Sequence, residues 1–226
     1  MTTSAEAKFD EHFYRRHYVS YELQNPPRKL RFYRQLLEDA AGRAPGLRIL
    51  ELGCAFGHLL ATLDPSWRLS GLDASQFAIE DARRRVPNGS FATGSAERIP
   101  FEGPFDAIAA FDVLEHVPSL DEAAASIRAK LVPGGHLVFV VPVYDGPTGP
   151  VIRLLDRDET HIQRHSRGFW FDWAAGAGFR VRAWRGIYRY LLPGGHYVHW
   201  PTQRLRRFTP AVAIVARREQ IFRESS

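Results

Sequence analysis

The chain has 226 residues, of which 45% are hydrophobic and 24% are charged, so it can bury one substantial core. Its single cysteine excludes an internal disulfide framework, and it has neither an apolar leader nor an apolar run near the roughly 20 residues that cross a membrane. We therefore expect a cytoplasmic globular protein with one domain over residues 1–226, and we do not expect its net charge of +5 to serve nucleic-acid binding.

Residues 1–44 carry a helical pattern, which we interpret as an N-terminal helical cap. Aromatic residues recur at helical spacing within residues 5–24, and this predicts one short helix or two. These rings either pack on the core or form a flap over a substrate. The tripeptide at 25–27 then breaks the helix, and a second helix with apolar residues at i, i+3, i+7 and i+10 from Leu30 stops at Gly42.

From residue 45 to residue 142, predicted strands alternate with helices of about a dozen residues. The predicted strands are 47–52, 68–72, 90–94, 105–111 and 137–141, and the predicted helices are 75–86 and one that begins at the capping box 119–122. This alternation indicates right-handed βαβ crossovers, and therefore an α/β fold with a parallel sheet.

Beyond residue 142 the pattern is less regular. We expect two long excursions on the substrate side, at 143–165 and 188–208, together with a helix at 166–177 and strands at 179–187 and 211–216. The second excursion is rich in aromatic residues, which suit either a flat, apolar acceptor or a dimer interface. These aromatic residues are Tyr188, Tyr190, Tyr197 and Trp200.

The stretch from Arg48 to Leu60 predicts a strand, a tight turn of glycines and small residues, and the start of a helix. Such a turn presents backbone N–H groups to a ligand. A dinucleotide fingerprint would place glycines at 53, 55 and 58, whereas the sequence has Ala55 and His58. The turn therefore argues against a dehydrogenase.

Asp73 stands at the end of the second predicted strand, at the position where a carboxylate can accept hydrogen bonds from both hydroxyls of an adenosine ribose. The alternative is that Asp73 only caps the next helix. Ser75 is also available as the cap, so both roles can be filled at once.

Six motifs follow one another between residues 51 and 137. They are Glu51-Leu-Gly-Cys-Ala-Phe-Gly, Gly71-Leu-Asp-Ala-Ser, Gly94-Ser-Ala-Glu-Arg-Ile-Pro-Phe, Phe105-Asp-Ala-Ile, Asp112-Val-Leu-Glu-His-Val and Leu131-Val-Pro-Gly-Gly-His-Leu. As a set they resemble the class I S-adenosylmethionine-dependent methyltransferases, most closely the small-molecule branch. The resemblance covers roughly residues 45–142. It implies a Rossmann-like sheet with strand order 3-2-1-4-5-7-6, an antiparallel last strand and helices on both faces.

The resemblance also implies a cofactor, S-adenosylmethionine, with S-adenosylhomocysteine as the product, and a role for each matching residue. The residues that it places at the methionine part are Glu51, Gly53, Cys54 and Gly57. It places Asp73 at the ribose and Ala74 beside the adenine. Ser95 stands where the family usually has an aspartate, so backbone groups of Ala96 and Glu97 would take over that adenine contact. Phe111 and Asp112 would border the sulfonium.

Three of the nine histidines are candidate general bases for the acceptor proton. His116 follows the fourth predicted strand, on the ligand side of the sheet, and His161 and His165 lie at i, i+4 near the end of the first excursion. The alternative for each is a histidine that only packs or forms hydrogen bonds. No third ligand is identifiable beside the His161 and His165 pair, so we do not expect a metal.

Together these features predict methyl transfer to an O or N atom of a small-molecule acceptor in specialised metabolism, by in-line displacement. The expected partner is that acceptor, with no membrane and no nucleic acid, and the chain is expected to be a monomer or a homodimer. Two alternatives remain open at this point. One is an adenosyl-ligand-binding subunit without turnover, and the other is a nucleic-acid methyltransferase, for which Arg204, Arg206 and Arg207 form the best local basic cluster.

Overall fold

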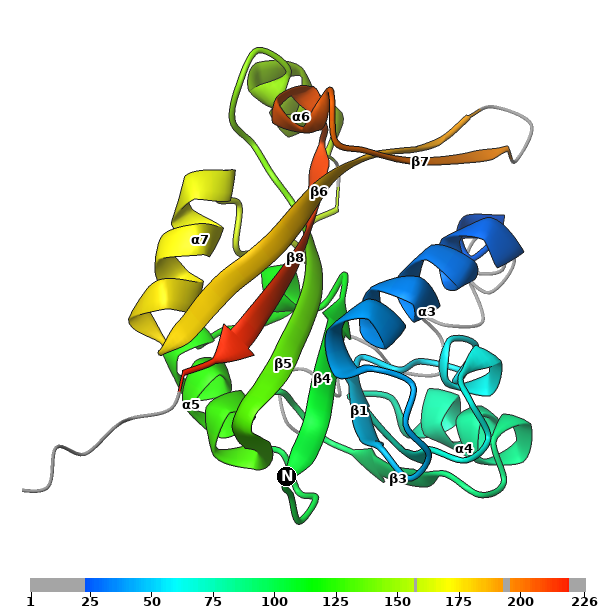
Figure 1. Ribbon diagram of the computed structural model, residues 1–226. Coiled ribbons are helices and arrows are strands. Elements are labelled where there is room, and N and C mark those ends of the chain that lie inside the picture. Colours follow the sequence, from blue (N-terminus) through cyan, green and yellow to red (C-terminus); the bar gives the residue numbers. More distant parts are fainter. Residues whose placement is uncertain (1–22, 157, 193–195, 220–226) are drawn as a thin grey trace, which may run out of the picture.

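A computed structural model describes residues 23–156, 158–192 and 196–219, which form one mixed sheet with helices on both faces (Figure 1). The strands are β1 (Arg48–Leu52), β2 (Arg68–Asp73), β3 (Ser90–Thr93), β4 (Phe105–Phe111), β5 (Leu131–Pro142), β6 (Phe179–Leu191), β7 (Tyr197–Thr202) and β8 (Ala211–Arg218). Their order across the sheet is β3-β2-β1-β4-β5-β8-β6-β7. Strands β1 to β5 pair in parallel, and β8 runs antiparallel to both β5 and β6.

All but one of the described α-helices fall where the sequence predicts them, within a few residues. They are α3 (Pro27–Ala41), α4 (Gln76–Arg85), α5 (Leu120–Lys130), α6 (Gly149–Leu155) and α7 (Arg167–Gly176), with short 3₁₀ helices η1 (Leu60–Thr62), η2 (Leu114–His116) and η3 (Arg206–Phe208). The α/β class is therefore confirmed. The predicted N-terminal helix or helix pair falls mostly on residues 1–22, which lie outside the described residues.

The strand order implied by the resemblance is confirmed, with one addition. The predicted sixth and seventh strands correspond to β6 and β8, which take the expected places beside β5. The expectation of an irregular excursion over 188–208 is wrong, because β6 continues to Leu191 and pairs with a further strand, β7, at the sheet edge. Side chains alternate between the two faces of a strand. In the short segments that form the end of β6 and β7, only a few residues carry this alternation, so the sequence there looks like that of a loop.

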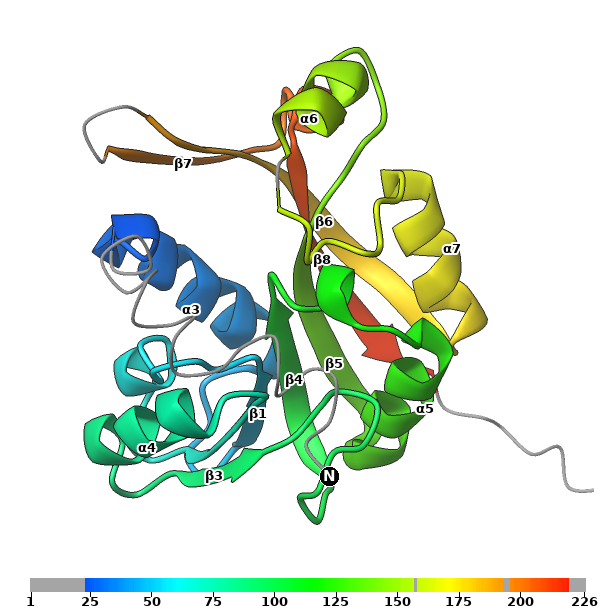
Figure 2. The ribbon, with the colours of Figure 1, turned by 180° about the vertical axis from the view of Figure 1, so that it is seen from behind.

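Two apolar layers sandwich the sheet, one on each face (Figures 1 and 2). Successive residues of β1 illustrate the division, because Leu50 belongs to the layer that contains α5 and α7, whereas Ile49 belongs to the layer that contains α3 and α4. In β4, Ile108 and Ala109 divide in the same way. A strand that is covered on both faces reads as a continuous apolar run, and this explains the uninterrupted run at 105–111.

Serine caps fix the starts of three of these helices. The Oγ of Ser75 accepts a hydrogen bond from Ala78 N, the Oγ of Ser119 accepts one from Glu122 N, and the Oγ of Ser166 accepts one from Phe169 N. Each bond satisfies one of the backbone N–H groups that a helix start leaves without a partner. The predicted capping box at 119–122 therefore does begin a helix.

The prediction of a helix directly after the glycine turn is wrong. Only η1 forms there, because Asp64 and Pro65 interrupt the segment and β2 begins at Arg68. The first excursion is also more ordered than expected, since it contains α6. Within the ranges that the model describes, none of the helices combines the length and the apolar character that a membrane crossing requires.

Candidate functional site

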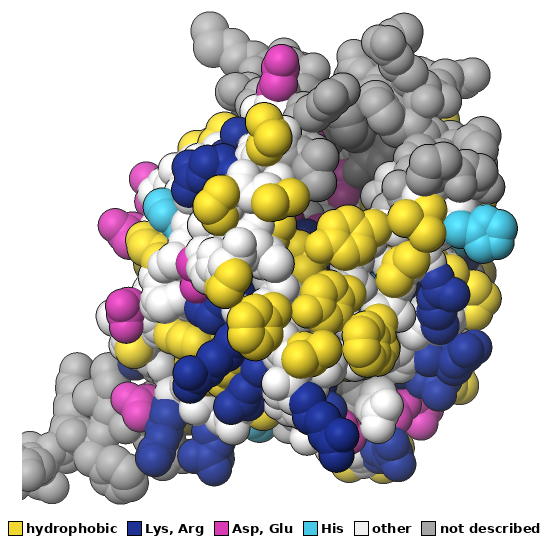
Figure 3. All heavy atoms as spheres, turned by 90° about the horizontal axis from the view of Figure 1, so that it is seen from above, with side chains coloured by type: hydrophobic (Ala, Val, Ile, Leu, Met, Phe, Trp, Pro, Cys, Tyr) yellow, Lys and Arg dark blue, Asp and Glu magenta, His cyan; other side chains and the backbone are white. Residues whose placement is uncertain are grey.

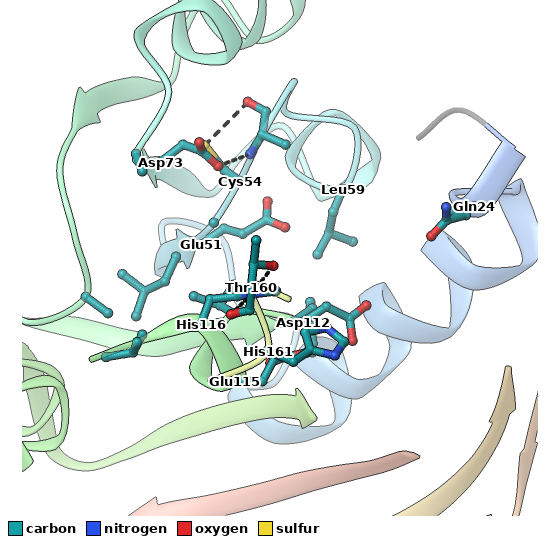
Figure 4. Close-up of a pocket in the computed structure, with 18 of the residues that line it drawn as sticks. Gln24, Glu51, Cys54, Leu59, Asp73, Asp112, Glu115, His116, Thr160 and His161 are labelled. Carbon is teal, nitrogen blue, oxygen red and sulfur yellow. Dashed lines mark hydrogen bonds between the residues drawn. The ribbon is translucent and has the colours of Figure 1, made fainter. Parts of the chain in front are cut away.

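A cavity of about 850 Å³ lies where the carboxyl ends of β1, β2 and β4 meet. This is the edge at which open α/β sheets bind ligands. The cavity is lined by the glycine turn after β1, the end of β2, residues 94–97, the end of β4 and η2. Parts of α3, β6 and β7 and residues 156 and 158–161 complete the lining. Figure 4 shows Asp73 and Cys54 at one end of this pocket, Glu51 between, and Glu115, His116 and His161 at the other end.

The glycine turn holds its shape through left-handed backbone conformations. Gly53 has a φ of +66° and Gly57 a φ of +72°, and the non-glycine Ala55 shares the left-handed region with a φ of 43°. A Cβ on Gly53 would lie 2.3 Å from Cγ2 of Val113, so the backbone approaches the loop after β4 more closely than a side chain allows. Cys54 N donates to Leu72 O over 3.0 Å, and this bond ties the turn to β2.

The carboxylate of Asp73 fastens the turn from the side of β2. Its Oδ2 accepts a hydrogen bond from Ala55 N at 2.8 Å, and its Oδ1 accepts one from Ser75 N at 2.9 Å. Both carboxylate oxygens are thus oriented by backbone amides. Asp73 is buried and lines the cavity together with Ala74.

Glu51 is a buried carboxylate at the second-to-last position of β1. Its Oε2 is buried and makes no hydrogen bond within the described part of the chain. Burial raises the pKa of Glu51 well above its usual value, and the nearby Asp73 carboxylate raises it further, whereas the Lys29 ammonium opposes both. A cationic ligand group beside Glu51 would find an acceptor already desolvated.

The loop after β3 contributes Ser95, Ala96 and Glu97 to the cavity wall. The side chain of Glu97 also has a structural role, since its Oε1 accepts a hydrogen bond from Ser119 N, at the start of α5, over 3.1 Å. The predicted adenine-side residues are therefore together in space with the predicted ribose-side residue, Asp73.

At the end of β4, Phe111 and Asp112 border the cavity as predicted. The Phe111 ring stacks on Tyr33 with 4.2 Å between ring centroids. Asp112 has a φ of 60° and forms ion pairs with Arg189 and with Lys29. Burial alone would raise the pKa of Asp112, but these two cations outweigh it and hold the pKa below its usual range.

The structure brings two of the three candidate histidines together and leaves the third apart. The rings of His116 and His161 lie 4.9 Å apart between centroids, and both residues line the cavity. His165 is not one of the described residues that line the cavity. Its ring stacks on Phe169 at 3.6 Å, and its Nε2 lies 2.9 Å from Gln163 Oε1.

Several residues of the site were not singled out by sequence reasoning. Lys29 and Tyr33 reach the cavity from α3, Glu115 from η2 and Arg189 from β6. Glu115 is completely buried, and burial together with the Asp112 charge raises its pKa to about 8. The sequence did contain a signal for Glu115, since it lies inside the motif at 112–117. Nothing in the sequence indicated Lys29, Tyr33 or Arg189.

The aromatic residues of the second excursion, on the β6–β7 hairpin, divide between the cavity and the exposed surface. Tyr190 and Tyr197 line the cavity. Tyr188 stacks on Trp200 at 5.5 Å, and Trp200 is 55% exposed. Seen from above in Figure 3, hydrophobic side chains gather across the middle of the surface, with Lys and Arg side chains at its edge. The interpretation as acceptor contacts is compatible with the position of Tyr190 and Tyr197, and the interpretation as a dimer interface is compatible with the exposure of Trp200. Both stay predictions.

A protein-family model for a methyltransferase domain matches residues 16–183. A 37.1 kDa protein in transposon TN4556 of Streptomyces fradiae is 38% identical over 126 residues, which are 52% of this chain and 36% of that protein. Trans-aconitate 2-methyltransferase of Methylobacterium nodulans is 29% identical over 167 residues, which are 65% of this chain and 63% of the relative. The match therefore spans less than two thirds of the length of either curated relative.

Among solved structures, the YcgJ protein of Bacillus subtilis aligns with a TM-score of 0.66 at 17% identity. The alignment covers 84% of this chain and 99% of that one. At this identity the likeness concerns the fold.

Proposed function

Since the chain belongs to the methyltransferase domain family, within the class I S-adenosylmethionine-dependent enzymes, we propose that it transfers a methyl group from S-adenosylmethionine to an O or N atom of a small-molecule acceptor. The observation that carries the proposal is the single cavity that joins the glycine turn, Glu51 and Asp73 to a cluster of polar side chains at its other end. The similarity to an enzyme named for trans-aconitate supports a small acceptor.

The residues of the cavity fit the proposed cofactor. The buried Oε2 of Glu51 offers an acceptor for the cofactor's ammonium group, and Gly53 lines the cavity where the methionine part would lie. Asp73 is oriented to accept from the ribose hydroxyls, and Ala74, Ser95, Ala96 and Glu97 form the wall for the adenine. Cys54, Phe111 and Asp112 line the same half of the cavity. Gly57 is not among the described residues that line it and packs against Ala82 of α4 instead, so we do not propose a direct cofactor contact for Gly57.

When bound, S-adenosylmethionine supplies an electrophilic methyl group on a sulfonium. The task of the chain is then to hold the acceptor atom in line with that methyl group and to exclude water. His116 and His161 supply imidazole nitrogens at the acceptor end, and burial lowers the pKa of His116, so that its ring is neutral and can accept a proton. His165 lies apart from this end, so we propose the base role for the other two.

Calorimetry with S-adenosylhomocysteine tests the cofactor half of the proposal. Wild-type chain should bind one equivalent, and Asp73→Asn should weaken binding by about tenfold or more, because the ribose loses a charged acceptor. Asp81→Asn, an exposed site on α4, is the matched control and should bind as wild type. Absence of binding to the wild-type chain would overturn the proposal.

A panel of small hydroxyl and amine acceptors tests the transfer half, with production of S-adenosylhomocysteine as the readout. Turnover with at least one acceptor is expected. Cofactor binding without turnover on any acceptor would instead favour the alternative of a non-catalytic adenosyl-binding subunit.

A further inference from the structure

Three side chains at the acceptor end of the cavity have the composition of a metal site. Glu115, His116 and His161 each offer a ligand atom, and these atoms lie within 4.8 Å of one another. Figure 4 shows the three residues grouped beside Asp112. Ligand atoms about 2.1 Å from one tetrahedral ion lie about 3.4 Å apart, so a pair at the 4.8 Å limit has to close by about 1.4 Å.

Glu115 is the donor that makes this group more than a pair of histidines. Its side chain has no exposed surface, and neither Oε1 nor Oε2 makes a hydrogen bond within the described part of the chain. A buried carboxylate without partners is costly unless a cation or a donor faces it. The cavity that Glu115 lines is the space from which such a cation would come.

The two histidines are held in the form that binds metals. Nδ1 of His116 donates to Thr160 O at 3.0 Å, and Nδ1 of His161 donates to Asp156 Oδ2 at 2.9 Å. A carbonyl or carboxylate oxygen can only accept, so Nδ1 is the donor in both rings, and a neutral ring then carries its lone pair on Nε2. Nε2 of His161 also lies 3.6 Å from Oδ2 of Asp158, which a bound cation would have to displace or share. Metal-binding histidines in proteins are usually oriented by this kind of bond to a carboxylate or a backbone carbonyl.

The backbone holds the two segments of the cluster in register. Ile162 N and Gln163 N both donate to the carbonyl oxygen of Glu115, at 2.9 and 3.0 Å, and the side-chain amide of Gln163 donates to Val117 O at 2.9 Å. The segment that carries His161 is thus fastened to η2, which carries the other two donors. Preorganisation of this kind removes an ordering cost from ligand binding.

We propose that Glu115, His116 and His161 bind a divalent cation of the first transition series, of which Zn²⁺ and Mn²⁺ are suitable probes. Two imidazoles and one carboxylate suit such ions better than Mg²⁺ or Ca²⁺, which favour oxygen ligands. The structure thus supplies the third donor that the sequence did not identify. Because the cation uses the Nε2 lone pairs, this role replaces the base role of both histidines.

Metal binding to the full chain, stripped with chelator beforehand, tests this inference without any methyl donor. Isothermal titration with Zn²⁺ and with Mn²⁺ should show one site per chain, and pulsed electron paramagnetic resonance of the Mn²⁺ complex should show ¹⁴N couplings from imidazole. Glu115→Gln and His161→Asn should each weaken the site at least tenfold. His165→Gln, outside the cluster, is the matched control and should bind as wild type.

An ion that binds to the wild-type chain without nitrogen coupling, or that binds equally well to Glu115→Gln, would overturn the inference, as would no binding at all. If a variant fails to fold, the wild-type resonance spectrum still decides. A chain that binds metal but not S-adenosylhomocysteine would refute the proposed function and leave this site standing, and the reverse result would refute only the site.

Discussion

Lys29 and Asp112 form an ion pair across the cavity wall, with 3.4 Å between Nζ and Oδ2. The first residue lies in α3 and the second follows β4, so the pair joins the helical cap to the centre of the sheet. The Lys29 side chain is only 7% exposed, and burial lowers its pKa, although the Asp112 charge opposes that effect. Arg189 of β6 pairs with the other oxygen of Asp112, so one carboxylate compensates two cations.

The replacement Asp112→Asn is expected to lower the free energy of unfolding by about 3 kcal/mol, because it leaves Lys29 and Arg189, whose side chains are only 7% and 15% exposed, without their counter-charge. Asparagine keeps the shape and tolerates the left-handed backbone of residue 112. Urea unfolding at neutral pH measures the loss. Asp81→Asn removes exposed ion pairs to Arg84 and Arg85, and it should cost less than about 1 kcal/mol. Equal losses in the two variants would contradict the buried-pair argument.

The replacement Gly53→Ala should both destabilise the chain, by about 1–3 kcal/mol, and weaken binding of S-adenosylhomocysteine at least tenfold. The new Cβ would lie 2.3 Å from Val113 Cγ2, in a backbone with a φ of +66°. Gly176→Ala is the matched control, since a Cβ there meets no heavy atom within 4 Å. Thermal unfolding and calorimetry on both variants check the prediction, and a Gly53→Ala chain that behaves like the control would refute it.

Local patterns explain why so much of the fold was predictable. The apolar run at 105–111 and the serine cap at Ser119 each act through neighbours in sequence, and both gave the correct element. The lining of the cavity was predictable where a residue stands at the end of a strand, as Asp73 does in β2. Lys29 was not predictable, because a lysine on an amphipathic helix looks like a solvated residue until its partner, 83 positions later, is known. The position of Glu115 likewise depends on residues 162 and 163, whose N–H groups donate to its carbonyl oxygen from a segment more than 40 positions later in the chain.

Glu51 is expected to release a proton when the ammonium group of S-adenosylhomocysteine binds. Its pKa is raised in the free protein, by burial first and Asp73 second, and a neighbouring cation lowers it again. The affinity for S-adenosylhomocysteine should therefore increase as the pH rises through the raised pKa of Glu51. The number of protons released on binding should be largest at pH values below that pKa, where Glu51 is protonated in the free protein. Calorimetry in buffers of different ionisation enthalpy measures the proton count. Identical buffer dependence in wild type and Glu51→Gln would show that the proton comes from elsewhere.

His199 should make the folded state sensitive to mild acid. Its ring is buried in β7 against Phe32 and Tyr33. Burial, aided by the Lys29 charge, lowers the pKa of His199 to about 4. The charges of Arg189 and Arg28 lower this pKa further, whereas the Asp112 charge raises it. The unfolded chain, with an ordinary histidine pKa of about 6.5, thus binds more protons than the folded chain between these two values.

The stability that this neutral ring contributes is fully present above pH 6.5 and is lost as the pH falls through 4. The difference between the two pKa values corresponds to about 3 kcal/mol. The replacement His199→Phe keeps an aromatic ring in the same apolar surroundings but removes the titration, so its unfolding free energy should fall less between pH 7 and pH 4 than that of wild type. Urea unfolding of both proteins at the two pH values measures this difference. Parallel losses would mean that His199 is not the group responsible, and titration of its imidazole signals by NMR would then show a pKa near the ordinary value.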